Sequence, residues 1–351
     1  CWSLSEAWAE KADAEWVPLP EVWVTPSISK VNTGYIAGGT PANNTDRLNF
    51  DNDTKTHISN SWPANPKNAG AGGNLHGYVA GGSSYQNTIN KLVYSTDTLT
   101  TSPSTLSSGR GYARGCNSET AAYICCGAGS FNSYRSIVDK ITHATDACER
   151  IPGADLPSAN TKQSAMATTA HPSAAYIQGG VSPATTAVSK LTFSTEGSAQ
   201  VPGAAMITAR GYATTTSNGT NTYIYGGGTN NNGSVQTTDV DKTVFSSDTT
   251  TNIPANMPNN YNVRAAAAGA STFGIIAGGY SPGPSITNAA IKFTYGSESV
   301  ATAPGYNLNN SKQYMSGFSA RNGFTGTTYD GDIARWFDSA AASPNFGYSA
   351  T

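Results

Sequence analysis

Residues that could hold a metal or act in catalysis are few in this 351-residue chain. The histidines are His57, His76, His143 and His171. The five cysteines form no Cys-x-x-Cys pair of the kind that binds zinc. We find no Ser-His-Asp spacing, phosphate-cradling loop or metal-ligand cluster above chance. The sequence therefore predicts a protein that is not an enzyme and carries no catalytic residues, metal or cofactor.

Four cysteines, Cys116, Cys125, Cys126 and Cys148, fall within one short part of the chain. A link from Cys116 to Cys125 or Cys126 across neighbouring strands is compatible with their spacing. We favour the simpler interpretation of small, buried thiols. Cys1 is either the lipid-bearing residue of a processed bacterial lipoprotein or merely the first residue of this sequence, and we favour the second.

Charged residues make up 12% of the chain, about half the usual fraction of roughly 25%, and they are regularly placed. One pattern reads basic, apolar or Thr, any residue, aromatic or His, with an acid three places later. It occurs at Arg47–Phe50 with Asp53, Lys91–Tyr94 with Asp97, Lys140–His143 with Asp146, Lys190–Phe193 with Glu196, Lys242–Phe245 with Asp248, and Lys292–Tyr295 with Glu298. A second basic residue precedes the next copy, at Lys67, Arg110, Lys162, Arg210, Arg264 and Lys312.

These periodic charges favour a structural role. The acid lies in a Ser- and Thr-rich stretch typical of a hairpin turn. We expect the basic residues to pair with turn acids of neighbouring units or to cap carbonyls. Because Arg110, Arg210 and Arg264 fall at one repeated site, we expect them to be spread around the molecule instead of converging. His143 occupies an aromatic position of the pattern, which indicates a core residue and not a metal ligand.

A third mark has the same period: an aromatic residue or Ile, a short apolar step, and usually Gly-Gly. Copies occupy residues 34–39, 77–82, 122–127, 175–180, 222–227 and 274–279, with a degenerate copy at 323–326. Successive copies start 43 to 53 residues apart, which is the period of propeller blades.

Each unit reads as four strands: one after the leading basic residue, one ending in Gly-Gly, one at Lys-Leu-x-Phe, and one in the Thr-rich segment. Residues such as Leu48 and Phe50 share a face of their strand and need a neighbouring sheet to cover them. We place Gly-Gly on inner strands, where glycine permits close backbone approach. The expected fold is an all-β, seven-bladed propeller of four-stranded blades, with six blades plus a cap as the alternative, because the seventh copy is eroded.

Composition excludes several classes of partner. The net charge is −2 and the basic residues are evenly distributed, so no basic stripe for nucleic acid is expected. No stretch of eighteen apolar residues exists, so we expect no membrane span. Strict apolar periodicity argues against disorder despite the many Ser, Thr, Asn and Gly residues.

The first residues differ from the repeats. Ser3–Glu6 has capping-box spacing for a helix that runs to about Trp16, on which Trp8 and Trp16 belong to one apolar stripe. Val17–Pro20 would end that helix. We assign residues 1–20 to an N-terminal arm and residues 21–351 to the propeller. Since large aromatic residues are strong interface anchors, we favour an arm that docks on another protein over one that folds back on its own propeller.

The repeats resemble the kelch-like repeats of virion structural and tail proteins of tailed phages, notably those of marine bacteria and cyanobacteria. The resemblance covers about 300 residues and is clearest from Tyr78 to Ala113 and from Thr186 to Gly227. Glu6–Glu10 is similar to segments of phage tail-fibre shafts. The resemblance implies a non-enzymatic virion component, in the tail or on the capsid surface, without assigned catalytic residues. The sequence departs from this pattern in two places. Cys125-Cys126 stands where Ala-Gly is expected, and the last copy is degenerate.

The resulting hypothesis is a structural or adhesive propeller of a phage particle, located in the virion, whose partners are other virion proteins and host surface polysaccharide. Candidate binding loops follow the Gly-Gly turns, at Ser83–Thr88, Thr229–Val235 and Tyr280–Ser285, although they could equally be solvated connectors. The alternative is a secreted or lipid-anchored kelch protein on the bacterial cell surface. A kelch-type copper oxidase or a glycosidase is a third hypothesis. The glycosidase is disfavoured because the Ser-x-Asp stretches of this sequence resemble only the start of the turn found in sialidases and lack the Gly and Trp of that turn.

Overall fold

The computed structural model describes residues 32–320, except 60–61, 63–66, 74, 131–132, 158–166, 172, 182, 231–232, 259–262 and 282–284; for 167–171 it describes the backbone alone. The chain divides into two units, residues 1–31 and 32–351, and all described residues belong to the second. The expected N-terminal arm with Trp8 and Trp16, and the seventh repeat copy at 323–326, lie outside the described residues.

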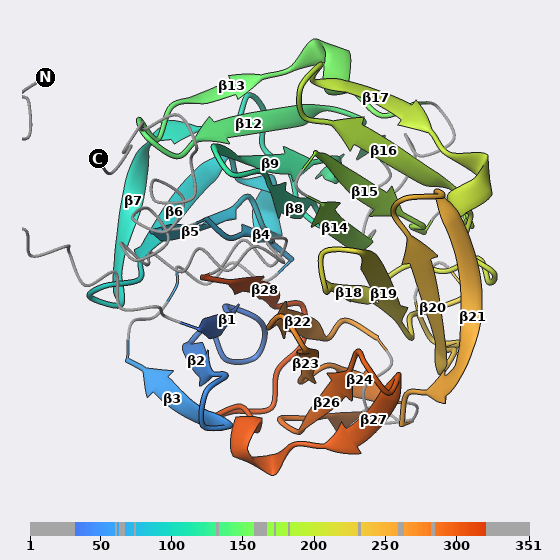
Figure 1. Ribbon diagram of the computed structural model, residues 1–351. Coiled ribbons are helices and arrows are strands. Elements are labelled where there is room, and N and C mark those ends of the chain that lie inside the picture. The colour runs from blue at the N-terminus through green and yellow to red at the C-terminus, as the bar shows by residue number, and fades with distance from the viewer. Residues whose placement is uncertain are drawn as a thin grey trace, which may run out of the picture. The chain divides into compact units, whose positions relative to one another are not determined.

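Six antiparallel sheets of four strands are arranged around an axis as a β-propeller (Figure 1). Blade 1 contains β28 (Ser316–Ser319), β1 (Thr33–Ala37), β2 (Thr45–Asn49) and β3 (Thr54–Ile58), and blade 2 contains β4 (Ala69–Ala71), β5 (His76–Ala80), β6 (Thr88–Val93) and β7 (Thr98–Thr105). Blade 3 contains β8 (Arg114–Asn117), β9 (Ala121–Cys125), β12 (Val138–Thr142) and β13 (Cys148–Arg150), and blade 4 contains β14 (Ala167–His171), β15 (Ala174–Gln178), β16 (Val188–Thr192) and β17 (Gly197–Gln200). Blade 5 contains β18 (Thr214–Ser217), β19 (Asn221–Tyr225), β20 (Asp239–Val244) and β21 (Thr249–Asn256), and blade 6 contains β22 (Ala266–Gly269), β23 (Phe273–Ala277), β26 (Ala290–Thr294) and β27 (Ser299–Thr302).

The remaining elements are short. Two small hairpins, β10 (Ala128–Ser130) with β11 (Ser133–Tyr134) and β24 (Tyr280–Ser281) with β25 (Ser285–Ile286), extend blades 3 and 6. The 3₁₀ turns are η1 (Ser83–Tyr85), η2 (Pro152–Ala154), η4 (Pro202–Ala204) and η5 (Pro304–Tyr306). The all-β propeller expected from the repeats is thus confirmed, as are its four strands per unit.

The propeller has six blades, and the main expectation of seven is corrected. The innermost strands contact one another in the order β28, β4, β8, β14, β18, β22 and back to β28, so the circle is complete. Closure depends on β28, which pairs with β1 and joins the two ends of the described chain in one sheet. Because the chain starts blade 1 without an inner strand, the strand after Lys312 completes that blade instead of opening a seventh.

Aromatic stacking joins one blade to the next. A second-strand tyrosine packs on the third-strand aromatic residue of the following blade in five of the six interfaces, with ring centroids 5.0 to 5.7 Å apart. The pairs are Tyr35–Tyr94, Tyr78–His143, Tyr123–Phe193, Tyr176–Phe245 and Tyr223–Tyr295. Between blades 6 and 1, Phe273 meets Phe50 edge to face at 5.6 Å. His143 therefore serves as a core aromatic residue, as its place in the repeat predicts.

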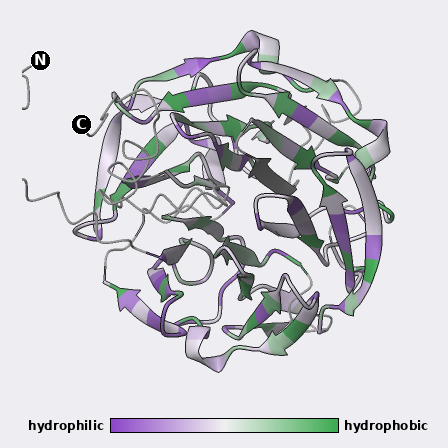
Figure 2. Ribbon diagram, viewed as in Figure 1, coloured by the Kyte–Doolittle hydropathy of each residue, from purple (hydrophilic) through white to green (hydrophobic). Residues whose placement is uncertain are grey.

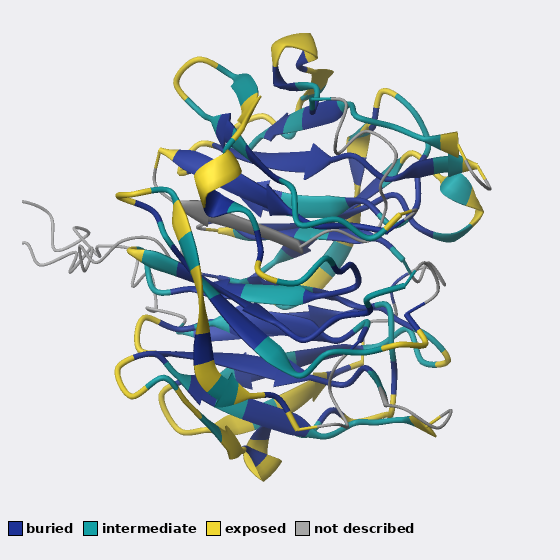
Figure 3. Cartoon of the chain, turned by 90° about the vertical axis from the view of Figure 1, so that its right-hand side faces the viewer, coloured by how far each residue is buried: buried dark blue, intermediate teal, exposed yellow. Residues whose placement is uncertain are grey.

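Burial follows the expected alternation along the strands. Leu48 and Phe50 are both buried in the cluster shared by blades 6 and 1. Hydrophobic and hydrophilic segments succeed each other along β12 and β16 in Figure 2. In Figure 3 the inner strands are largely buried, whereas exposed residues gather at turns and on the outer strands. Each sheet thus depends on its neighbours for a dry interface, as the repeat pattern requires.

The Gly-Gly pairs directly follow the second strands, next to the innermost strand of each sheet, and do not lie within a strand. The close backbone approach expected of them is confirmed. Gly81 and Gly82 have φ of 69° and 127°, a conformation that residues with a Cβ rarely adopt. A Cβ on Gly81 would lie 2.3 Å from the carbonyl oxygen of Arg110. The pair is therefore needed for a left-handed turn that passes close to the segment leading into the next blade.

Six ion pairs connect successive blades. The third-strand basic residue of each blade contacts the turn acid of the next blade, as expected from the periodic charges. The pairs are Arg47–Asp97, Lys91–Asp146 (2.6 Å), Lys140–Glu196 (2.6 Å), Lys190–Asp248 (2.9 Å), Lys242–Glu298 (2.6 Å) and Lys292–Asp53 (2.9 Å). All six acids have positive φ, from 48° to 56°, which is the left-handed position of a hairpin turn.

Candidate functional site

One end of the propeller gathers both the variable loops and the residues that lead into the inner strands. Because neighbouring strands are antiparallel, the Gly-Gly turns after the second strands lie at the same end as the starts of the innermost strands. Hydrogen bonds confirm this proximity: Gly82 N donates to the carbonyl oxygen of Arg110, and Gly180 N to that of Arg210, both at 2.9 Å. We call this end the Gly-Gly face.

Three tyrosines meet near the axis on the Gly-Gly face. Tyr112, Tyr212 and Tyr314 precede the innermost strands of blades 3, 5 and 1, and their ring centroids are 5.8 to 6.5 Å apart in edge-to-face contacts. Their φ angles are 55° to 57°. Since the three positions come from alternate blades, this end of the ring has approximate three-fold symmetry.

Two cations alternate with the tyrosines. Lys67 Nζ lies 4.9 Å from the ring centre of Tyr112 and 5.5 Å from that of Tyr314, while the Arg264 guanidinium lies 4.6 Å from the Tyr314 ring and 5.1 Å from the Tyr212 ring. Such cation–π contacts contribute about 0.5–1 kcal/mol each at exposed sites and more when desolvated. We call these five residues the axial cluster.

Backbone hydrogen bonds hold the axial cluster in place. Lys67 N donates to Tyr314 O (3.1 Å) and Tyr112 N to Lys67 O (2.6 Å). On the other side, Arg264 N donates to Tyr212 O (3.1 Å) and Tyr314 N to Arg264 O (3.0 Å). The cluster therefore rests on main-chain bonds between adjacent blades, which position its side chains independently of their own contacts.

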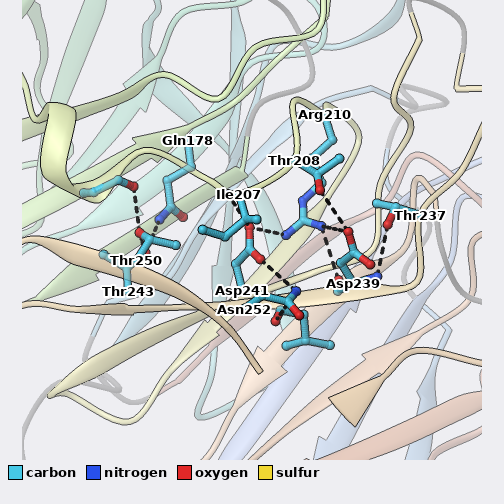
Figure 4. A network of polar contacts seen from close by, with 12 residues as sticks. Gln178, Ile207, Thr208, Arg210, Thr237, Asp239, Asp241, Thr243, Thr250 and Asn252 are labelled. Atoms are coloured by element: carbon cyan, nitrogen blue, oxygen red, sulfur yellow. Dashed lines mark hydrogen bonds and ion pairs between the residues drawn. The ribbon is translucent and has the colours of Figure 1, made fainter. Parts of the chain in front are cut away.

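The basic residues that lead into the innermost strands of blades 3, 5 and 1 are buried in ion pairs. Arg110 contacts Asp139 at 2.5 Å, Arg210 contacts Asp241 at 2.8 Å, and Lys312 contacts Asp46 at 3.0 Å, with all six side chains fully buried. In blade 5, Figure 4 shows Arg210 reaching both Asp241 and Asp239, with Asn252 donating to Asp241 at 3.2 Å. Burial lowers the pKa of Arg210 and of Lys312, and the adjacent carboxylates oppose that shift.

One third-strand position decides which role a leading basic residue takes. It is Asp46, Asp139 and Asp241 in blades 1, 3 and 5, but Asn90, Ser189 and Ile291 in blades 2, 4 and 6. Where the aspartate is present, the cation is buried against it. Where it is absent, Lys67 and Arg264 contact the axial tyrosines. Lys162, the equivalent residue of blade 4, lies outside the described residues.

The described parts of the candidate binding loops lie beside this cluster. The ring of Tyr280, at the start of the predicted loop Tyr280–Ser285, lies 5.3 Å from the Arg264 guanidinium. In the loop Thr229–Val235, a Cβ on Gly233 would lie 3.1 Å from the Tyr212 ring. The loop Ser83–Thr88 begins with η1, and Tyr85 approaches Gly111 beside Tyr112. The described parts of the three loops thus lie on one face, which their sequences alone did not indicate.

The chemistry of the axial cluster suits binding of polar or anionic groups. Burial raises the pKa of Tyr212 and of Tyr314, while the Arg264 guanidinium acts in the opposite direction. The two phenols therefore remain protonated at neutral pH and can donate hydrogen bonds beside two cations. Aromatic faces, hydroxyl groups and positive charge together are the groups that bind acidic sugars or carboxylates.

The described histidine and cysteine side chains form no comparable site. His57 lies on β3 with Nδ1 3.7 Å from Asp46, His76 begins β5, and His143 stacks on Tyr78. The side chain of His171 is not described. Among the residues that the structure describes, no group of three or more His, Cys, Asp or Glu is placed to hold a metal ion.

Cys116, Cys125, Cys126 and Cys148 are free thiols. The Sγ atoms of Cys116 and Cys125 are 4.0 Å apart. Cys116 and Cys126 are buried, and the hydrogen bond to Cys125 together with burial raises the pKa of Cys116. These residues act as small core side chains, which agrees with the simpler interpretation of the sequence.

The axial tyrosines are not among the residues predicted from the sequence, although the sequence contains a signal for them. Arg-Gly-Tyr-Ala occurs at 110–113 and 210–213, and Lys-Gln-Tyr-Met follows at 312–315, so the tyrosine recurs in every second unit. The expectation that Arg110, Arg210 and Arg264 do not converge is confirmed, since the first two are buried in separate blades and only Arg264 reaches the axis.

In comparisons with known proteins, no family model and no curated protein matches this chain. Within the described ranges, no helix has the length and apolar character that a membrane crossing requires.

Proposed function

We propose that this protein is a non-enzymatic structural or adhesive component of a bacteriophage particle that binds anionic groups of a host surface polysaccharide on its Gly-Gly face. The observation that supports binding is the axial cluster: three tyrosines and two cations, held by main-chain hydrogen bonds, with the described parts of three polar loops beside them. The virion assignment rests on the resemblance of the kelch-like repeats alone.

The periodic charges support a scaffold. All six third-strand basic residues are engaged in pairs between blades, and Arg110, Arg210 and Lys312 are buried in pairs within blades. These residues stabilise the ring. We assign polysaccharide binding to the Gly-Gly face and attachment to the particle to the N-terminal arm. We assign attachment to Trp8 and Trp16, whose amphipathic spacing suits docking on another virion protein.

Binding is tested with alginate, a polyuronate, and with dextran as its neutral counterpart. We expect the purified protein to bind alginate and not dextran, and the double variant Lys67→Gln/Arg264→Gln to lose at least tenfold in affinity. The matched control is Lys91→Gln/Lys242→Gln, which removes two lysines that pair with hairpin-turn acids outside the axial cluster. Equal losses in both double variants would contradict binding at the axial cluster.

The biological setting is tested separately. Copurification with capsid and tail proteins, lost in Trp8→Ala/Trp16→Ala, is the outcome expected for a virion component. Diacylglycerol on Cys1, detected by mass spectrometry of the protein from its natural source, would favour the lipid-anchored cell-surface protein instead.

A further inference from the structure

His143 places a titratable ring in an interface position that the other blades fill with uncharged aromatic side chains. It directly follows β12 in blade 3, and its ring stacks on Tyr78 of blade 2, with centroids 5.7 Å apart and planes inclined by 14°. The equivalent residues of the other five blades are Phe50, Tyr94, Phe193, Phe245 and Tyr295. Phenyl and phenol rings stay neutral between pH 5 and 8, whereas an imidazole titrates in this range.

The imidazole is closely packed against the main chain of blade 2. The edge of the ring lies against Gly73, which is buried and precedes β5. A Cβ on Gly73 would lie 2.8 Å from His143 Cε1 and 3.1 Å from each ring nitrogen. The interface therefore admits the imidazole only because residue 73 has no side chain.

The two ring nitrogens of His143 differ in their surroundings. Nε2 is shielded from solvent, and no described residue forms a hydrogen bond with it. Nδ1 therefore forms the hydrogen bond that joins the ring to the main chain of Ser118. The neutral imidazole carries its proton on Nδ1, so a second proton would create a charged N–H group at Nε2, where no described acceptor receives it. Burial of such a group is unfavourable.

Titratable groups surround this ring on several elements. The turn between β8 and β9 contacts the backbone of His143, whose N donates to Thr120 O at 3.0 Å. The groups are His76 and Tyr78 on β5, Lys91 on β6, Tyr94 directly after β6, Asp146 in the turn after β12, and the exposed Glu119 in the turn between β8 and β9.

These groups do not offset the cost of protonation. Asp146 would favour an imidazolium ion, but its carboxylate already accepts hydrogen bonds from Lys91 Nζ and from the Tyr78 hydroxyl group, both at 2.6 Å. Burial has the largest effect and lowers the pKa of His143, and the charges of His76 and Lys91 act in the same direction. The hydrogen bond to the main chain and the charge of Asp146 oppose this shift.

We propose that His143 makes the interface between blades 2 and 3 an acid-sensitive contact, which loosens when the imidazole takes up a proton. Because the folded pKa is the lower one, the stabilising contribution of His143 is complete above about pH 6.5, where an unfolded histidine titrates, and is lost as the pH falls through the folded pKa. This inference is independent of the proposed function, because it concerns the ring itself and not what the Gly-Gly face binds.

The chain itself supplies the test variant. His143→Phe introduces the residue that blades 4 and 5 carry at the equivalent position. We expect the urea midpoint of the natural protein to fall between pH 8 and pH 5, and this fall to be smaller by about 0.5 M in His143→Phe. His57→Gln is the control, because it removes an exposed histidine of the outer strand β3, and it should keep the full decrease. An equal decrease in the natural protein and in His143→Phe would overturn the proposal.

Hydrogen exchange of the natural protein provides a second measurement, which does not depend on the folding of a variant. Exchange is followed by mass spectrometry at pH 5 and pH 7.5 and corrected for the intrinsic rates. We expect peptides of β5 and β12 to open several-fold more often at pH 5. Peptides of β15 and β20, from the interface that contains Tyr176 and Phe245, should show no such change. Opening that is unchanged in β5 and β12, or that increases equally in both interfaces, would contradict a contact controlled by His143.

Discussion

Lys292 and Asp53 are 239 residues apart in the chain, yet Lys292 Nζ lies 2.9 Å from Asp53 Oδ1. This contact is the sixth of the ion pairs between blades and joins blade 6 to blade 1. Tyr306 adds a hydrogen bond of 2.8 Å from its hydroxyl group to the same carboxylate. In four other blades the second-strand tyrosine provides that bond, but Ile275 occupies its place in blade 6, so a residue of η5 supplies the missing hydroxyl group.

Ring closure by β28 predicts where the chain can be shortened. A chain that ends at Thr325 should keep cooperative unfolding, because it retains β28 and its pairing with β1. A chain that ends at Ser311 loses the inner strand of blade 1 and the buried Lys312–Asp46 pair, and we expect it to be aggregated or unfolded. Circular dichroism and size-exclusion chromatography distinguish the two. Loss of folding in the longer chain would mean that residues after 325 are required for closure.

The buried Arg110–Asp139 pair predicts a large effect of a minimal substitution. Asp139→Asn removes the charge that balances a fully buried guanidinium and should lower the free energy of unfolding by about 3–5 kcal/mol. Asp146→Asn is the matched control, since Asp146 is partly exposed in a left-handed turn that asparagine tolerates; we expect a loss of about 1 kcal/mol or less. Denaturant titration measures both, and similar losses would contradict the division into buried and surface pairs.

Buried tyrosines predict loss of stability in alkali. Burial, followed by the hydrogen bond to Asp248, raises the pKa of Tyr176 to about 12, and burial raises that of Tyr123 to about 12. An unfolded tyrosine ionises near pH 10. Because the folded pKa is the higher one, the stabilising contribution is complete below pH 10 and is lost as the pH rises from 10 to 12.

The denaturant midpoint should therefore decline steeply above pH 10. Tyr176→Phe should show a shallower decline, since it removes one of the titrating phenols. A midpoint in the natural protein that is constant to pH 11.5 would contradict this assignment.

The cysteines of blade 3 predict protection from alkylation. Cys116 and Cys126 are buried and their thiol pKa values are raised, so little thiolate is present at pH 8. Iodoacetamide should modify them only after denaturation, as followed by peptide mass spectrometry. Burial raises the thiol pKa of Cys148 as well, to about 12, but its side chain is partly exposed, so Cys148 is the internal comparison for access of the reagent. Rapid modification of Cys116 in the folded protein would show that blade 3 opens.

The local spacing of residues was enough to predict the contacts between blades, but it did not predict the candidate site. The aromatic position of Phe50, Tyr94 and His143 and the turn acids followed from spacing, because each role is repeated in every blade and depends on strand alternation. The axial tyrosines were missed because Tyr112, Tyr212 and Tyr314 are about 100 residues apart and meet only when alternate blades surround one axis. Arg110 is buried in an ion pair, whereas Arg264 contacts the axial tyrosines. Which of the two occurs depends on a third-strand residue of the same blade, too far along the chain for a local sequence pattern to include it.

The sequence by itself determined that this protein is a ring of four-stranded sheets, because periods of two residues and of about 48 residues specify strands that must cover one another. Only the tertiary structure decided that the ring closes with six blades, since the angle between sheets and the pairing of β28 with β1 depend on packing around the whole circle. It also decided which cations face the axis. A buried guanidinium needs a carboxylate within a few ångströms, and that distance is set by the fold and not by the order of residues.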